Sequence, residues 1–189
     1  MSSPSGRFVW HDLMTTDPSA AQDFYTDVVG WSLTPYPGSD PPYTMWTVGE
    51  SLIGGSMGLP EEALAQGAPP HWHGYVTVED VDASLALVEE MGGQAFHDPE
   101  DMPEVGRFVT IGDPQGAVIA LFTPAGEMAP HPDWPRIGDF SWNELVTDDH
   151  EAAFAFYARL FGWEKTGSLD MGPLGAYLTF GEGGTTYGG

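Results

Sequence analysis

The sequence predicts an α+β fold built from repeated βαβββ modules. Residues 8–31 (FVWHDLMTTDPSAAQDFYTDVVGW) and 140–163 (FSWNELVTDDHEAAFAFYARLFGW) match without a gap, and Trp10 aligns with Trp142 at a constant offset of 132 (142 − 10). A repeat of this kind is typical of duplicated supersecondary units. Each copy joins a strand-like apolar run to a helical pattern, and strand-like runs separated by proline and glycine follow the first copy.

The first helix is expected to begin after Asp17, which suits the N-cap, and Pro18 suits the first helical position. Gly30 can end the helix in the left-handed conformation. Apolar residues recur at helical spacing and predict a face that packs on a sheet. They are Ala21, Phe24, Tyr25 and Val28 in the first copy and Ala153, Phe156, Tyr157 and Leu160 in the second.

Three strand-like runs, WSLTPY, YTMWTV and SLIGGSM, complete the first module. A more divergent unit follows, with a strand over 73–80, a helix over 81–93 capped by Asp80, and a hairpin over 107–124 that turns at DPQG. The expected order is therefore βαβββ, βαβββ and βαββ. We predict a complete domain at 7–124 (modules 7–60 and 71–124), a proline-rich linker at 125–139 and a partial second domain at 140–189.

The charge of the chain is strongly acidic, with 5 Lys+Arg against 28 Asp+Glu and a formal net charge of −23. Such a surface repels phosphate backbones and acidic membranes, so we expect no nucleic-acid or membrane partner. The chain has no cysteine, which excludes disulfides, thiolate zinc sites and cysteine nucleophiles. Without a signal peptide or a long apolar run, a cytoplasmic location is expected.

Three segments in order carry a family resemblance: TTDPSAAQDFYTDVVGW, then VEDVDASLALVEEMGG with GRFVTIGDPQGAVIALFTP, and VTDDHEAAFAFYARLFGW. The chain resembles the vicinal-oxygen-chelate superfamily of glyoxalases, extradiol dioxygenases and bleomycin-binding proteins, and within it the tandem glyoxalase-like proteins. The resemblance implies that paired modules form a curved mixed sheet that partly encloses a cavity. It also implies metal ligands on the first strand of each module and near the end of the last strand.

The metal positions implied by the resemblance are degenerate here. Strand alternation puts Trp10, Asp12 and Met14 on one face, which we expect to line the cavity, with His11 on the other. The implied ligand positions fall on Trp10, His73 and Ala120, and neither an indole nor a methyl group can ligate a hard or borderline metal ion. We therefore expect no cofactor; any divalent metal would be held by His73 with Asp12.

Asp12 is the candidate for acid–base work, and its repeat partner Glu144 is also acidic. An acid among aromatic residues has a raised pKa and could act as a general base. The alternative is that the W-x-acid-L pattern belongs to the fold, with the carboxylate holding a backbone amide or a tyrosine hydroxyl. His73 is the expected polar partner. The candidate ligand-binding residues are Trp10, Met14, Trp46, Tyr75, Phe122 and Glu144, with core packing as the alternative for the tryptophans.

Two functions remain open at this point. The first is a glyoxalase-like protein that binds a small metabolite in the first domain, with lyase, isomerase or dioxygenase-related activity if it is an enzyme. The second is a non-catalytic small-molecule binding or sequestration protein of the bleomycin-resistance type. The third module lacks a predicted companion, so it is expected to pair with that of a second copy in a homodimer, unless the chain is incomplete. The residues leave the substrate and the reaction open.

Overall fold

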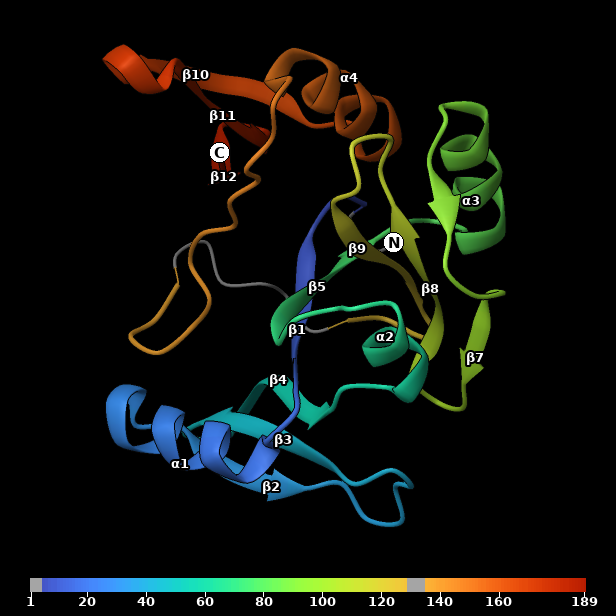
Figure 1. The fold of residues 1–189 in the computed structure, drawn as a ribbon, viewed down its shortest axis with the longest axis vertical. Coiled ribbons are helices and arrows are strands. Elements are labelled where there is room, and N and C mark those ends of the chain that lie inside the picture. Colours follow the sequence, from blue (N-terminus) through green and yellow to red (C-terminus); the bar gives the residue numbers. More distant parts are fainter. Residues whose placement is uncertain (1–4, 129–134) are drawn as a thin grey trace. The chain divides into compact units, whose positions relative to one another are not determined.

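The computed structural model describes residues 5–128 and 135–189 (Figure 1). The chain divides into two compact units. We call residues 9–74 with 131–140 the α1 unit, and residues 1–8, 75–130 and 141–189 the α3–α4 unit, after the helices they contain. Each unit has its own hydrophobic core.

The α1 unit contains a four-stranded arrangement in the order β2-β3-β4-β1. Its elements are β1 (Phe8–Thr15), α1 (Pro18–Val29), β2 (Ser32–Pro35), β3 (Tyr43–Val48), β4 (Ser51–Gly58) and the short helix α2 (Glu61–Ala65), followed by β5 (His71–Thr77), which leads into the other unit. The β1–β4 pair is parallel, and the β2–β3 and β3–β4 pairs are antiparallel. Helix α1 packs on the face that carries Leu13 and Trp46 (Figure 1).

The α3–α4 unit contains strands in the order β5-β9-β8-β6, with β7 also paired to β8, and a separate sheet in the order β10-β11-β12. Its elements are α3 (Val81–Glu90), β6 (Gln94–Ala95), β7 (Glu100–Met102), β8 (Gly106–Gly112), β9 (Val118–Pro124), α4 (His150–Phe161), β10 (Glu164–Asp170), β11 (Ala176–Glu182) and β12 (Thr185–Gly188). None of the helices over the described residues is long and apolar enough to span a membrane.

The predicted fold class is confirmed: helices and mixed sheets alternate in the order expected for βαβββ modules. The predicted N-caps Asp17 and Asp80 and the helix end at Gly30 are confirmed, whereas α3 ends at Glu90 and not at the predicted residue 93. The Asp17 and Asp149 side chains accept hydrogen bonds from Ala20 N and Ala152 N, both at 3.0 Å. Asp80 caps α3 in the same way. Gly30 and Gly162 end their helices at φ values of +80° and +76°, in the left-handed region where glycine avoids a Cβ clash.

The start of the second copy differs from the expectation. The repeat predicts a strand in residues 140–147, yet this segment forms only an isolated parallel bridge between Asn143 and Gly188. In the first copy, by contrast, β1 pairs with β4 over four consecutive positions.

The core of the α3–α4 unit includes residues from both sides of the predicted linker. Helix α4 belongs to the second copy of the repeat, but its buried face packs with the middle module. Phe156, Tyr157 and Leu160 share one core with Val76 of β5 and Leu121 of β9. Burying this much branched and aromatic surface stabilises the pairing of α4 with the middle module. The middle module therefore shares its core with the segment beyond the predicted linker.

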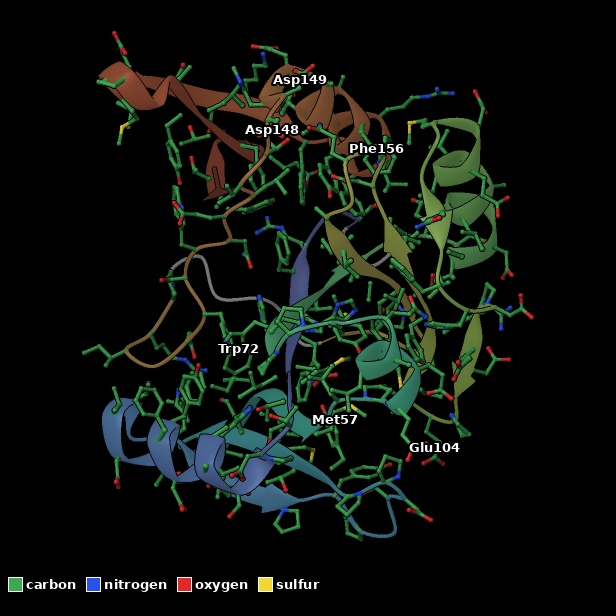
Figure 2. The ribbon with its side chains drawn as sticks, viewed as in Figure 1. Met57, Trp72, Glu104, Asp148, Asp149 and Phe156 are labelled. Carbon is green, nitrogen blue, oxygen red and sulfur yellow. The ribbon has the colours of Figure 1, made fainter. Side chains whose placement is uncertain are left out.

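The turn between β8 and β9 is tied to the beginning of α4. The buried Asp113 carboxylate accepts hydrogen bonds from Gln115 N (2.8 Å), Ala117 N (2.9 Å) and Tyr157 Oη (2.9 Å). The Gln115 side chain in turn donates to the carbonyl oxygen of Asp149 at 3.0 Å. Asp148 and Asp149 are labelled beside α4 in Figure 2. Burial is the main cause that raises the pKa of Tyr157, so its hydroxyl keeps its proton and remains a donor to Asp113.

Candidate functional site

Three polar side chains of the α1 unit form one hydrogen-bond network. Trp10 and Asp12 lie two residues apart on β1, so they share a face of the sheet, and Tyr43 begins β3. Trp10 Nε1 donates to Asp12 Oδ1 (2.9 Å) and to Tyr43 Oη (2.8 Å). Tyr43 Oη donates to Asp12 Oδ1 at 2.6 Å. Asp12 is 5% exposed, while Trp10 and Tyr43 are half-buried, so the network reaches the surface of the unit through its aromatic members.

A glycine on β4 makes room for this network. Gly55 lies opposite Asp12 in the parallel register. A Cβ at Gly55 would lie 1.9 Å from Tyr43 Oη and 2.7 Å from Asp12 Oδ1, far inside contact distance. The phenol ring of Tyr43 therefore crosses β4 only because this position has no side chain.

The second copy repeats the network with the same types of side chain. Trp142 Nε1 donates to Tyr177 Oη at 2.8 Å, and Tyr177 Oη donates to Glu144 Oε1 at 2.8 Å. A Cβ at Gly189 would lie 2.4 Å from the Tyr177 ring. Burial, followed by the hydrogen bond to Glu144, raises the pKa of Tyr177, so its hydroxyl stays protonated and keeps donating. The duplication therefore preserves a complete three-residue constellation.

Tyr43 and the two adjacent glycines of β4 are not among the residues predicted from the sequence, although the sequence contains a pattern that marks them. In both copies a tyrosine is followed, after ten residues, by two glycines: Tyr43 with 54–55 and Tyr177 with 188–189. Between tryptophan and tyrosine, however, the separation is 33 residues in the first copy and 35 in the second. The gap-free repeat ends before that two-residue difference, so it does not bring the two tyrosines into register.

Methionines surround the network on the same face of the sheet. The register places Met57 of β4 next to Met14 of β1 and opposite Tyr43 of β3, and Met45 opposite Gly55. Met57 is labelled in Figure 2. Flexible thioether side chains adapt to ligands of different shape and make favourable contacts with aromatic rings. Met14, a predicted ligand-binding residue, thus lies on the same face as Trp10 and Asp12.

The donor hydrogens of Trp10 and Tyr43 both form hydrogen bonds within the network. Trp10 has one N–H, which is shared between Asp12 and Tyr43, and Tyr43 has one O–H, which is donated to Asp12. Such a network can bind a further molecule through the lone pairs of its oxygen atoms, which accept hydrogen bonds. A ligand that joins it without breaking it must therefore bring hydrogen-bond donors.

Trp46, another predicted ligand-binding residue, lies in the core. Its ring is fully buried, and its centroid lies 5.3 Å from that of Trp31 and 5.7 Å from that of Tyr25. Its Nε1 donates to Gly55 O at 2.8 Å. His11 lies on the same side, stacked on Phe140 at 4.0 Å, as expected for the residue beneath the sheet. The packing favours the core alternative for Trp46.

Tyr75 and Phe122 belong to the α3–α4 unit. The Tyr75 ring lies 6.0 Å from Phe108, which pairs with Phe122 across the β8–β9 register. His97 packs on the same ring at 5.4 Å, and its Nε2 accepts a hydrogen bond from Thr110 N at 3.1 Å. These residues form an aromatic group on the sheet face opposite the α3 core.

All five lysine and arginine side chains lie in the described part of the chain, and each has an intramolecular partner. Four of them form ion pairs, and Arg7 lies over an aromatic ring at 4.6 Å. The partners are Tyr187 for Arg7, Asp82 and Asp101 for Arg107, Asp139 for Arg136, Glu90 for Arg159 and Glu151 for Lys165. All five cations are therefore engaged within the protein, and Arg107 forms exposed salt bridges with Asp82 and Asp101.

This charge distribution predicts that salt stabilises the fold. Raising sodium chloride from about 0.05 to about 0.5 M screens repulsion among the excess carboxylates more than it weakens a few exposed ion pairs. We expect the Tm to rise by about 2–4 °C for each 1 kcal/mol of repulsion removed. Differential scanning calorimetry at several salt concentrations measures this, and a Tm that falls with salt would show that the ion pairs dominate.

The chain belongs to the Glyoxalase/Bleomycin resistance protein/Dioxygenase superfamily, whose model matches residues 7–121. CFP32 of Mycobacterium tuberculosis (strain CDC 1551 / Oshkosh), which is named as a glyoxylase, is 37% identical over 155 residues. That match takes in 81% of this chain and 59% of CFP32. The anthracycline biosynthesis protein DnrV of Streptomyces peucetius is 32% identical over 170 residues, which take in 83% of this chain and 61% of DnrV. The chain thus spans about 60% of the length of these relatives.

Among solved structures, the Mn(II)-bound glyoxalase of Novosphingobium aromaticivorans has the same fold. It superposes with a TM-score of 0.55 at 18% sequence identity, over 87% of this chain and 54% of the glyoxalase. This similarity supports the α+β modules and the order of their elements.

The implied metal positions do not fit a divalent cation in this chain. Trp10 presents an N–H donor that is engaged with Asp12 and Tyr43, and Ala120 has no ligand atom. His73 is 1% exposed, with its ring 6.2 Å from that of His71. Over residues 5–128 and 135–189, no group of three or more His, Asp or Glu side chains is arranged to hold a metal ion. Catalytic sites for such ions use three protein ligands.

Proposed function

We propose that this chain binds a small, partly aromatic metabolite at the Trp10–Asp12–Tyr43 network, without a metal ion. The proposal rests on one observation. The indole N–H of Trp10 and the phenol O–H of Tyr43 both donate to Asp12, so both donors are used within the network. Such a network recognises a ligand by accepting hydrogen bonds from it. Hydroxyl, enol and amine groups are the donors a small metabolite can supply.

The surroundings of the network support an aromatic ligand. The half-buried Trp10 and Tyr43 rings and the methionines Met14, Met45 and Met57 provide a polarisable apolar surface beside the carboxylate. One relative is named for anthracycline biosynthesis and another is named as a glyoxylase, which agrees with small organic ligands. Because every Lys and Arg side chain already has an internal partner, an anionic ligand is disfavoured.

Two versions of this function differ in what Asp12 does. As a catalyst of the lyase or isomerase type, Asp12 would accept a proton from a ligand hydroxyl or from a carbon next to a carbonyl group, while Tyr43 holds its carboxylate in place. As a binding or sequestration protein, the chain would use the same hydrogen bonds without proton transfer. Two donors already hold Asp12 Oδ1, and this favours the binding version.

Replacing Asp12 with Asn is expected to weaken ligand binding. The probe is 4-ethylphenol, whose hydroxyl is a donor, and the comparison is 4-ethylanisole, which lacks that hydrogen. The loss of a hydrogen bond to a charged group costs about 1.5–3 kcal/mol, which corresponds to a rise of at least about tenfold in Kd. The Trp10 indole N–H resonance in ¹H–¹⁵N spectra, assigned with Trp10→Phe, reports binding.

Asp23→Asn on the exposed side of α1 is the matched control, and its Kd is expected to remain within about twofold of the original value. Equal Kd values for Asp12→Asn and the unaltered protein, or equal binding of both probes, would contradict the proposal. Deuterium exchange of dihydroxyacetone in heavy water separates the two versions. Exchange that Asp12→Asn abolishes supports catalysis, and its absence from the unaltered protein supports binding alone.

A further inference from the structure

We propose that the Trp142–Glu144–Tyr177 network is a second ligand site, selective for an aromatic ligand that carries an amine. The proposal rests on the function proposed for the first network and specifies the ligand class for its repeat. Its basis is the recurrence of the three side-chain types, with tryptophan donating to tyrosine and tyrosine donating to the acid at 2.8 Å each.

The second network presents its carboxylate to solvent. Glu144 is exposed, in contrast to Asp12 at 5% exposure, and Trp142 is 45% exposed. Within the part of the chain that the structure describes, the hydrogen bond from Tyr177 to Oε1 is the contact that Glu144 makes. Its second oxygen, Oε2, is therefore available to a ligand that lies against the indole.

A charged carboxylate beside an accessible indole face is suited to an ammonium group. Ammonium cations are attracted to the face of tryptophan, and N⁺–H···O⁻ hydrogen bonds are about twice as strong as neutral ones. Oε1 is held by Tyr177, which restricts the rotation of the Glu144 side chain and reduces the entropy lost on binding. The two cations of the same module, Arg159 and Lys165, are paired with Glu90 and Glu151, so neither is committed to Glu144.

The two networks are expected to differ in preference because their acids differ in exposure. Asp12 is nearly enclosed by Trp10 and Tyr43, where a neutral hydroxyl group costs less to desolvate than an ammonium group. Glu144 lies in solvent, where an ammonium group keeps part of its hydration shell while it pairs with the carboxylate. The chain would then bind two aromatic ligands of similar shape, one with a neutral hydroxyl group and one with an ammonium group.

The test is an NMR titration of the full chain with tyramine and with 4-ethylphenol, which differ by the ammonium group. In buffer with about 0.15 M salt to screen general attraction to the acidic surface, tyramine is expected to shift the Trp142 indole N–H resonance, assigned with Trp142→Phe. Its Kd there should be at least about tenfold lower than that of 4-ethylphenol, and Glu144→Gln should raise it by about tenfold. Glu164→Gln, an exposed acid on β10, is the matched control and should leave Kd within about twofold.

Equal Kd values for tyramine in Glu144→Gln and in the unaltered chain would overturn the second site, as would equal affinity for the two probes. The Trp10 and Trp142 resonances report the two networks separately. An unchanged response of Trp10 in Asp12→Asn contradicts the first proposal alone, and an unchanged response of Trp142 in Glu144→Gln contradicts the second alone. Intact spectra of each variant show that it has folded.

Discussion

Replacing Gly55 with alanine is expected to destabilise the α1 unit by about 1–3 kcal/mol, in the range for an overpacked core. The new methyl group would lie 1.9 Å from Tyr43 Oη and 2.1 Å from Tyr43 Cζ, so the phenol ring must leave its place over β4. Tyr43 would then stop donating to Asp12, and the buried carboxylate would lose its 2.6 Å hydrogen bond from the phenol. A fall in Tm of several degrees in calorimetry and a shifted Trp10 indole N–H resonance would report both effects.

Gly58→Ala is the control for this prediction. Gly58 lies on the same strand, and a Cβ there would meet nothing within 4 Å. Its Tm is expected to stay close to that of the unaltered protein. A second variant, Gly55→Ala with Tyr43→Ala, removes the ring that causes the clash, so its stability loss should be smaller than the sum of the two single losses. Additive losses would show that Gly55 acts through something other than Tyr43.

Asp113→Ala is expected to cost about 2–4 kcal/mol, because it leaves several donors without an acceptor. The Asp113 carboxylate is 5% exposed and receives two backbone N–H groups of the β8–β9 turn and the Tyr157 hydroxyl of α4. The loss should appear as a lower midpoint in urea unfolding, followed by the fluorescence of Trp163, which lies in the same core.

Asp148→Ala provides the comparison, because Asp148 is an exposed acid just before α4. Removing one negative charge from this acidic chain relieves repulsion, so this variant should be as stable as the original or slightly more so. Tyr157→Phe should fall between the two, since it removes one of the three donors together with its hydrogen bond. If Asp113→Ala matched Asp148→Ala, the carboxylate would not stabilise the turn.

The sequence best predicts the features that depend on neighbouring residues alone, such as the ends of helices. Asp17 and Gly30 set the ends of the first helix whatever surrounds it, because capping depends on the nearest backbone groups. The sequence predicts that the Asp12 carboxylate acts as a base or holds a backbone amide or a tyrosine hydroxyl, and in the structure Tyr43 donates to it. Which tyrosine donates to Asp12 depends on the register of β1, β4 and β3. Single-sequence patterns do not contain that register.

The other predictions depend on contacts between residues far apart in the sequence, which local patterns do not contain. The sequence leaves Trp46 as a ligand wall or a core residue, since a strand has two faces and the pattern does not tell which one the helix covers. The middle module shares its core with α4, a contact between residues far apart in the sequence. The strand expected in residues 140–147 likewise depends on a neighbour, and only the bridge between Asn143 and Gly188 forms there.

The core that α4 shares with the middle module bears on how this protein can be dissected. A fragment cut after Pro124 would retain β5, β8 and β9 but lose the aromatic side chains of α4 that keep water from Val76, Val109 and Leu121. Such a fragment would be prone to self-association through its bare aliphatic surface. Autonomous folding of the middle module therefore depends on carrying residues 141–163 with it.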